Sequence, residues 1–119
     1  MNIRIAVISL WAEDMATAVH FYRDVIGLNL MPRHGGDKYY FDLDGIALAI
    51  VSGRPAIQPD LEMRFPVVAF SVPDLRAAVG KLSQHGVDMP WGVEKNDDCQ
   101  WVMFHDPAGN LVELVEFRK

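Results

Sequence analysis

Residues 14–19 read DMATAV and residues 74–79 read DLRAAV, so that Asp, Ala and Val recur in register at an offset of 60 residues. This offset is about half of the 119-residue chain. Self-similarity at a fixed spacing indicates a repeated structural unit. We therefore expect the chain to consist of two similar halves.

The segments around the two copies also correspond. Each copy follows an apolar, β-type run and precedes a glycine and a hairpin-like segment, and the hairpin segments recur at an offset of 64. In the second half a tight turn, DPAGN at residues 106–110, joins two apolar runs, and residues 43–45 are its shorter counterpart. The pattern predicts a strand, a helix and three strands in each half. In the first half the apolar run is 3–10, the glycine is Gly27, and the hairpin-like segment comprises 39–42 and 45–51. In the second half the apolar run is 67–72, the glycine is Gly86, and the hairpin-like segment comprises 103–106 and 109–116.

Both predicted helices carry the same start and stop signals. Asp14 and Asp74 can accept hydrogen bonds from the free amides of a first helical turn and complement the positive end of its dipole. Gly27 and Gly86 can end the helices, because glycine adopts a left-handed backbone without steric cost. The apolar side chains between these signals recur every three or four residues, which predicts one buried face per helix. They are Met15, Ala18, Val19, Tyr22 and Ile26 in the first helix and Leu75, Ala78, Val79 and Leu82 in the second.

The length and the repeat together predict a single domain, residues 1–119, made of two βαβββ modules. The modules span about 1–53 and 66–119, and the proline-containing residues 54–65 link them. One helix covers only one face of a four-stranded sheet, so the other face needs a partner. We expect the halves to pair, within one chain or between two, around a shared cavity.

The composition excludes several classes of function. Eleven Lys and Arg residues against 16 Asp and Glu give a formal charge of −5. No basic cluster offers the phosphate-neutralising surface that nucleic acids need. The apolar runs are shorter than the roughly 20 residues that span a membrane, and no signal peptide is recognisable. Cys99 is the only cysteine. We expect a cytoplasmic protein without nucleic-acid or membrane partners.

Three segments resemble the vicinal oxygen chelate superfamily, which includes glyoxalase I, extradiol dioxygenases, fosfomycin resistance enzymes and bleomycin resistance proteins. They are HFYRDVIGL at 20–28, FSVPDL at 70–75 and FHDPAGNLVELVE at 104–116. The resemblance implies the α+β glyoxalase/bleomycin resistance fold, in which paired βαβββ modules form a curved mixed sheet around a central cavity. It also implies a homodimer.

Metal-using members of this superfamily bind a divalent ion through His, Gln or Glu on the first and last strands of each module. The resemblance and the two offsets place these positions at Val7, Ala49, Val67 and Glu113. Valine and alanine have no lone pair to donate, and one carboxylate is a poor site for metals that need three or four donors. We therefore expect neither a metal nor another cofactor.

The cavity is expected to be apolar, with one acid. Strand alternation places Glu113 on one face with Leu111 and Val115. The family pattern turns Trp101 and Met103 inward, Tyr39 is the counterpart of Met103 by the 64-residue offset, and Trp91 is expected to close one end. With Val7, Val67 and Ala49, these residues are the candidate ligand-binding set. For the aromatic residues and Met103, ordinary core packing is the alternative. For Glu113 the alternatives are a structural carboxylate and, less favoured, a general base.

The sequence favours a metal-independent protein that binds a small organic ligand, by sequestration or as a sensing module. The alternative is a glyoxalase-like lyase or isomerase, or a dioxygenase. Such an enzyme would use displaced metal ligands such as His34, His105 and Glu113, or Glu113 alone as catalytic base. A third possibility is a subunit whose sheets serve only assembly. Fold is a poor guide to the ligand in such a family.

Overall fold

The computed structural model describes residues 2–35, 37–53 and 64–118. The chain forms two compact units, residues 1–58 (unit 1) and 59–119 (unit 2). The predicted linker at 54–65 lies outside the described residues except for Arg64 and Phe65. Unit 1 contains β1 (Val7–Ala12), α1 (Met15–His20), the π-helical turn η1 (Phe21–Ile26), β2 (Asn29–Gly35), β3 (Lys38–Asp42) and β4 (Ala47–Ser52). Unit 2 contains β5 (Val68–Ser71), α2 (Leu75–Gln84), β6 (Val93–Lys95), β7 (Cys99–His105) and β8 (Leu111–Phe117).

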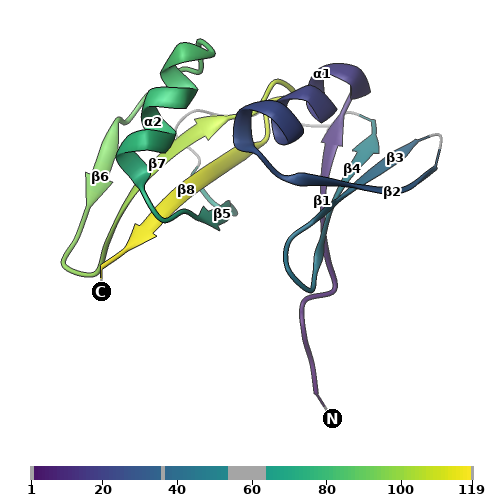
Figure 1. Ribbon diagram of the computed structural model, residues 1–119, viewed down its shortest axis with the longest axis horizontal. Helices are drawn as coiled ribbons and strands as arrows, with labels where there is room; N and C mark the ends of the chain where they lie inside the picture. The colour runs from purple at the N-terminus through teal and green to yellow at the C-terminus, as the bar shows by residue number, and fades with distance from the viewer. Residues whose placement is uncertain (1, 36, 54–63, 119) are drawn as a thin grey trace. The chain divides into compact units, whose positions relative to one another are not determined.

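Each unit is a four-stranded mixed sheet with its helix on one face (Figure 1). In unit 1 the strand order is β1-β4-β3-β2, and in unit 2 it is β5-β8-β7-β6. The first and last strands of each unit are parallel neighbours, and the other pairs are antiparallel. This confirms the predicted α+β fold built from two βαβββ modules.

The helix boundaries follow from the residues that marked them in the sequence. The Asp14 carboxylate accepts a hydrogen bond from the Thr17 amide at 3.1 Å, and that of Asp74 accepts one from Ala77 at the same distance. After the π-helical turn, Gly27 has a φ of 93°, a left-handed conformation that ends the helical segment. The first helix therefore continues past His20 as a wider turn before it stops.

The core of each unit lies between its helix and its sheet. In unit 1, Tyr22 of η1 is fully buried together with Phe41, Leu48 and Ile50 of the sheet. In unit 2, Leu75 and Leu82 of α2 are buried together with strand residues that alternate along β7 and β8. These strand residues are Val102, Phe104, Val112 and Leu114. Side chains between them therefore project from the face of each sheet that the helix does not cover.

The turn between β7 and β8 is organised by a buried carboxylate. Asp106 is 5% exposed and accepts hydrogen bonds from the Ala108 amide, the Asn110 amide and the Asn110 side-chain amide, at 3.0, 2.8 and 3.0 Å. These bonds satisfy the Asp106 carboxylate and the polar groups of the turn, whose burial without hydrogen bonds would cost free energy. The turn thereby fixes which residue of β8 lies opposite which residue of β7.

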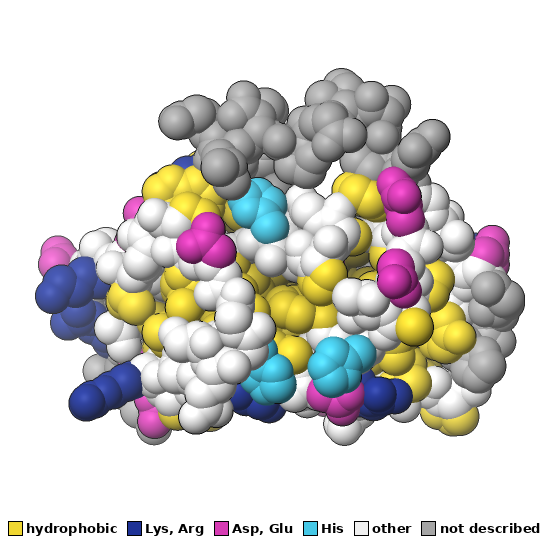
Figure 2. All heavy atoms as spheres, turned by 90° about the horizontal axis from the view of Figure 1, so that it is seen from above, with side chains coloured by type: hydrophobic (Ala, Val, Ile, Leu, Met, Phe, Trp, Pro, Cys, Tyr) yellow, Lys and Arg dark blue, Asp and Glu magenta, His cyan; other side chains and the backbone are white. Residues whose placement is uncertain are grey.

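Charged side chains of both signs are distributed over the surface. On the face that Figure 2 shows, Lys and Arg lie in separate spots among acidic and apolar side chains. Among the described residues, no helix combines the length and the apolar composition needed to cross a membrane.

Candidate functional site

A pocket of about 260 Å³ lies within unit 2. Met103 and Glu113 are direct neighbours across β7 and β8, and Trp101 pairs with Glu94 across β6 and β7. Strand alternation places these side chains on the sheet face away from α2, because the buried residues between them face the helix. The pocket therefore brings together three of the predicted ligand-binding residues. Its lining consists of Arg64, Phe65, Glu94, Trp101, Met103 and Glu113.

The wall of this pocket contains an ion pair that the sequence analysis missed. Both Arg64 terminal nitrogens donate to the Glu94 carboxylate, one of them at 3.2 Å to Oε2. One terminal nitrogen also lies 3.3 Å from the Met103 sulfur, and the guanidinium carbon lies 4.3 Å from the centre of the Trp91 ring. The side chains of Arg64 and Glu94 are only 27% and 28% exposed. The guanidinium is thus held by a carboxylate, a thioether and an aromatic ring.

Glu113 lies in the same pocket without such a partner. Among the described residues no donor forms a hydrogen bond or an ion pair with its carboxylate. Burial raises the pKa of Glu113, and the negative charge of Glu94 raises this pKa further, while the positive charge of Arg64 partly offsets both effects. The site therefore holds a half-buried carboxylate whose hydrogen-bonding capacity is unused.

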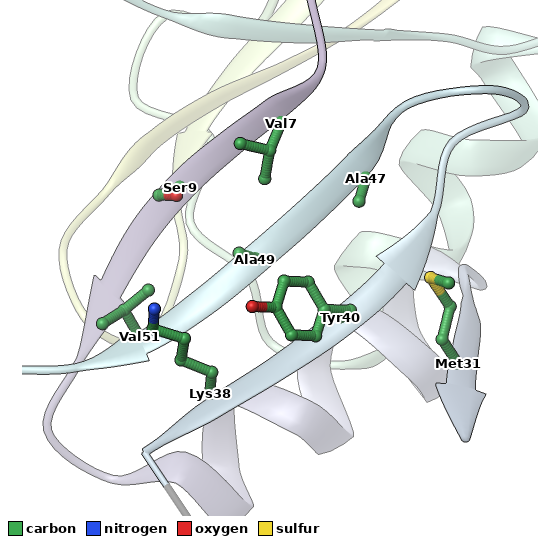
Figure 3. Close-up of a pocket in the computed structure, with 8 residues that line it drawn as sticks. All are labelled: Val7, Ser9, Met31, Lys38, Tyr40, Ala47, Ala49 and Val51. Carbon is green, nitrogen blue, oxygen red and sulfur yellow. The ribbon is translucent and has the colours of Figure 1, made fainter. Parts of the chain in front are cut away.

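Unit 1 has its own pocket, of about 230 Å³, on the sheet face away from α1 (Figure 3). Two residues of the predicted ligand-binding set, Val7 and Ala49, lie in it. The remaining lining residues, which the sequence analysis did not select, are Ser9, Met31, Lys38, Tyr40, Ala47 and Val51.

The expectation that Tyr39 faces inward with this set is wrong. Tyr39 pairs with the buried Ile50 on the helix-covered face, whereas Tyr40 pairs with Ala49 and lines the pocket. The cause is the length of the turn. Residues 43–46 separate β3 from β4, and residues 106–110, one more, separate β7 from β8. The offset of 64 residues therefore applies only after the turn, where Ala49 corresponds to Glu113. Before the turn the two halves are offset by one residue less, and the residue equivalent to Met103 is Tyr40 instead of Tyr39.

The other selected residues are not among the described residues that line the unit 2 pocket. Val67 is half-buried and directly precedes β5, and Trp91 contacts the pocket through the Arg64 guanidinium. The His105 ring lies 6.4 Å from that of Trp91, measured between ring centres. The side chain of His34 lies outside the described residues.

The donor set does not fit the divalent ion that metal-using relatives hold. Val7 and Ala49 contribute only hydrocarbon to the unit 1 pocket, and Val67 has no donor atom either. In the unit 2 pocket Glu94 is already paired with Arg64, which leaves Glu113 alone. Within the part of the chain that the structure describes, no three His, Cys, Asp or Glu side chains are grouped for metal binding.

Comparison with known proteins agrees with this architecture. Metallothiol transferase FosB of Lysinibacillus sphaericus (strain C3-41) is 26% identical over 105 residues, which cover 86% of this chain and 74% of that protein. A lactoylglutathione lyase from Agrobacterium tumefaciens has a TM-score of 0.74 at 22% identity, covering 97% of this chain and 94% of that one. TnmS3, an antibiotic binding protein from Streptomyces sp. CB03234, has a TM-score of 0.77 at 20% identity, covering 98% of both chains.

The two solved structures share the fold, and they include both an enzyme and a binding protein. A match to a family model extends over both units of the chain, from residue 4 to residue 114. The repeated βαβββ unit and this match lead to one assignment: the chain belongs to the Glyoxalase/Bleomycin resistance protein/Dioxygenase superfamily.

Proposed function

We propose that the protein binds a small organic molecule in the unit 2 pocket without a metal ion. The observation that carries this proposal is Glu113, a half-buried carboxylate beside Trp101 and Met103 to which no described residue donates a hydrogen bond. A buried polar group without a partner costs free energy, and a bound ligand can supply that partner. TnmS3 gives a precedent for antibiotic binding on this fold.

The charges of the pocket favour a cationic ligand. Because Glu94 neutralises Arg64, ionised Glu113 leaves the described lining of the pocket with one net negative charge. The aromatic rings of Trp101 and Phe65 add apolar surface and attract cations through their faces. A protonated amine attached to a planar or apolar body satisfies both features.

The size of the pocket restricts the ligand further. Drug-sized ligands occupy pockets of roughly 300–1,000 Å³. At about 260 Å³, the unit 2 pocket accommodates a single ring with a short substituent, or one end of a larger molecule. Benzylammonium is therefore a suitable probe, and benzyl alcohol is its uncharged counterpart of similar shape.

The second candidate is an enzyme of the lyase, isomerase or dioxygenase type in which Glu113 is the base. The observation in its favour is the raised pKa of Glu113, which makes the carboxylate a stronger base at neutral pH. The variant of this proposal that uses His34, His105 and Glu113 as displaced metal ligands has less support, because His105 is turned to Trp91 and does not line the pocket.

The test is calorimetric titration of the full chain with benzylammonium and benzyl alcohol. We expect benzylammonium to bind more tightly, and Glu113→Gln to weaken it roughly tenfold, or about 1.4 kcal/mol, because a charge-assisted hydrogen bond is lost. The matched control is Glu13→Gln, the same change at an exposed position, which should leave the affinity unchanged. Equal binding of both probes, or an unaltered affinity in Glu113→Gln, would contradict the proposal.

The family resemblance and the composition support two further proposals, a homodimer and a cytoplasmic location. Sedimentation equilibrium of the purified chain tests the first. A mass of about twice 13.4 kDa is expected, and a single species at 13.4 kDa would contradict it.

A further inference from the structure

A further pocket of unit 2 lies on the sheet face that α2 covers, opposite the candidate site. It has a volume of about 330 Å³ and lies where α2 runs beside the edge strand β6 (Figure 1). Its lining consists of Leu75, Arg76, Val79, Val93 and Gln100. Strand register places Val93 and Gln100 on this face, because Val93 pairs with the buried Val102 and Gln100 precedes it by two residues. The sheet therefore separates this pocket, the α2 pocket, from the unit 2 pocket.

The α2 pocket forms because the helix packs against β7 and β8 and leaves a gap beside β6. Leu75 and Leu82, which face the sheet, are each 1% exposed. Val79, which its spacing predicts for the same buried face, is only half-buried, and Val93 of β6 is 51% exposed. Apolar surface on both sides of the gap therefore remains in contact with water. A ligand that covers this surface gains hydrophobic stabilisation.

Two cationic side chains lie in or beside the α2 pocket. Arg76 lines it, and Lys95 shares the helix-covered face of β6 with Val93 and pairs with Gln100 across the strands. No described side chain forms an ion pair with either cation. In a protein with a net charge of −5, this is a locally positive, partly enclosed surface.

The acids next to the α2 pocket are already engaged in hydrogen bonds. Glu116 of β8 accepts one from the Leu75 amide at 2.7 Å and one from the Gln100 side-chain amide at 3.4 Å, and it is not among the described lining residues. The Asp74 carboxylate caps the first turn of α2. These bonds hold the start of the helix and the Gln100 amide in place. They leave the Arg76 guanidinium without an acidic partner among the described residues.

We propose that the α2 pocket is a second ligand site, which takes a short-chain organic carboxylate. The Arg76 guanidinium binds the two carboxylate oxygens, Lys95 adds positive charge, and the leucine and valine side chains of the lining contact the hydrocarbon chain. A volume of about 330 Å³ lies at the lower end of the range for small-molecule sites, roughly 300–1,000 Å³, and suits a short chain. The site goes beyond the proposed function and does not depend on it, since the two pockets share no described lining residue.

The test uses hexanoate, 1-hexanol and hexylammonium, which have similar chains and different charges, together with acetate, which lacks the chain. Amide resonances of the full-length, ¹⁵N-labelled protein are followed during each titration. We expect hexanoate to shift amides of α2, β6 and the start of β7, and to bind there at least threefold more tightly than each of the other probes. Raising the salt concentration should weaken hexanoate binding, because the contact is partly electrostatic. Hexanoate shifts confined to other parts of the chain, or equal affinity for 1-hexanol, would overturn the proposal.

The variant Arg76→Met removes the charge and keeps an apolar stem. We expect at least threefold weaker hexanoate binding, whereas Arg4→Met, the same change at an exposed position of unit 1, should have no effect. Val93→Thr should also weaken hexanoate binding, because a hydroxyl replaces a methyl group in the apolar wall. Thermal unfolding of the variants shows whether the fold is intact, and unchanged binding in folded Arg76→Met would contradict the assignment. Glu113→Gln should not alter hexanoate binding, so the two sites succeed or fail separately.

Discussion

Glu113 combines two properties that oppose each other. Its carboxylate is available to a ligand because no described side chain binds it, and for the same reason its burial is not compensated. Burial and the nearby Glu94 both favour the protonated form, which is why its pKa is raised. A residue of this kind lowers the stability of the free protein and is retained when binding or catalysis needs it.

This cost predicts a pH-dependent gain of stability in Glu113→Gln. Because the pKa is raised in the folded state, the folded protein binds more protons than the unfolded chain above pH 4.5, and wild-type stability falls as pH rises through that window. We expect the variant to melt about 1–3 °C above the wild type at pH 7, with a smaller difference at pH 4. Differential scanning calorimetry at both pH values measures this. A variant less stable at pH 7 would show that Glu113 has a stabilising partner.

The turn between β7 and β8 determines the register of the candidate site. Through its hydrogen bonds with Ala108 and Asn110, Asp106 holds residues 106–110 in a conformation that places Glu113 opposite Met103. The corresponding turn of unit 1, residues 43–46, is one residue shorter and contains Asp44 and Gly45 with φ values of 57° and 104°. The two modules therefore share a topology but differ in the register of one strand pair.

Removal of the Asp106 carboxylate is expected to destabilise the protein strongly. Asp106→Ala leaves three part-buried donors of Ala108 and Asn110 without this acceptor, at a cost of about 2–4 kcal/mol in the free energy of unfolding. Asp42→Ala is the matched control, because the exposed Asp42 accepts one bond, from the Asp44 amide, and its loss should cost below about 1 kcal/mol. Urea denaturation measures both values. Similar losses in the two variants would contradict this account of the turn.

Local signals were sufficient to predict the fold. Two of these signals depend on interactions within a few residues, namely the caps at Asp14 and Asp74 and the glycine after each helical segment. The structure confirms both. The repeat in the sequence indicated that the two halves share one topology. The candidate site was predicted only in part. Trp101, Met103 and Glu113 follow from strand alternation and the family pattern, and they do share a pocket.

The missed residues depend on contacts that no local pattern records. Arg64 lies at the end of the proline-containing segment and reaches Glu94, 30 positions later, on a strand of only three residues. Tyr40 was missed because one residue in a turn shifts the alignment of the two halves. Lys38 has no signal in the sequence, because a single lysine in a strand usually has only a solvated charge, and the pocket around it forms only in the folded unit.

At the scale of the whole molecule, the two units keep the same topology and differ in the chemistry of their pockets. In unit 2 the Glu113 carboxylate lies beside aromatic and thioether side chains, and in unit 1 the Lys38 ammonium lies with aliphatic ones; no described side chain forms an ion pair with either group. The family resemblance places the metal-ligand positions of metal-using members at Val7, Ala49, Val67 and Glu113, of which only Glu113 has a side chain that can bind a metal ion. We therefore propose that Glu113 binds the ligand without a metal.

The most direct test is the dissociation constant of benzylammonium for the full chain, measured by calorimetry under three conditions. These are the protein as purified, after removal of metals with EDTA, and after dialysis against Mn, Fe, Co, Ni or Zn, with metal content per chain determined by mass spectrometry. We predict the same dissociation constant throughout and far less than one ion per chain. One tightly bound ion per chain, with binding lost after EDTA and restored by that metal, would contradict the account.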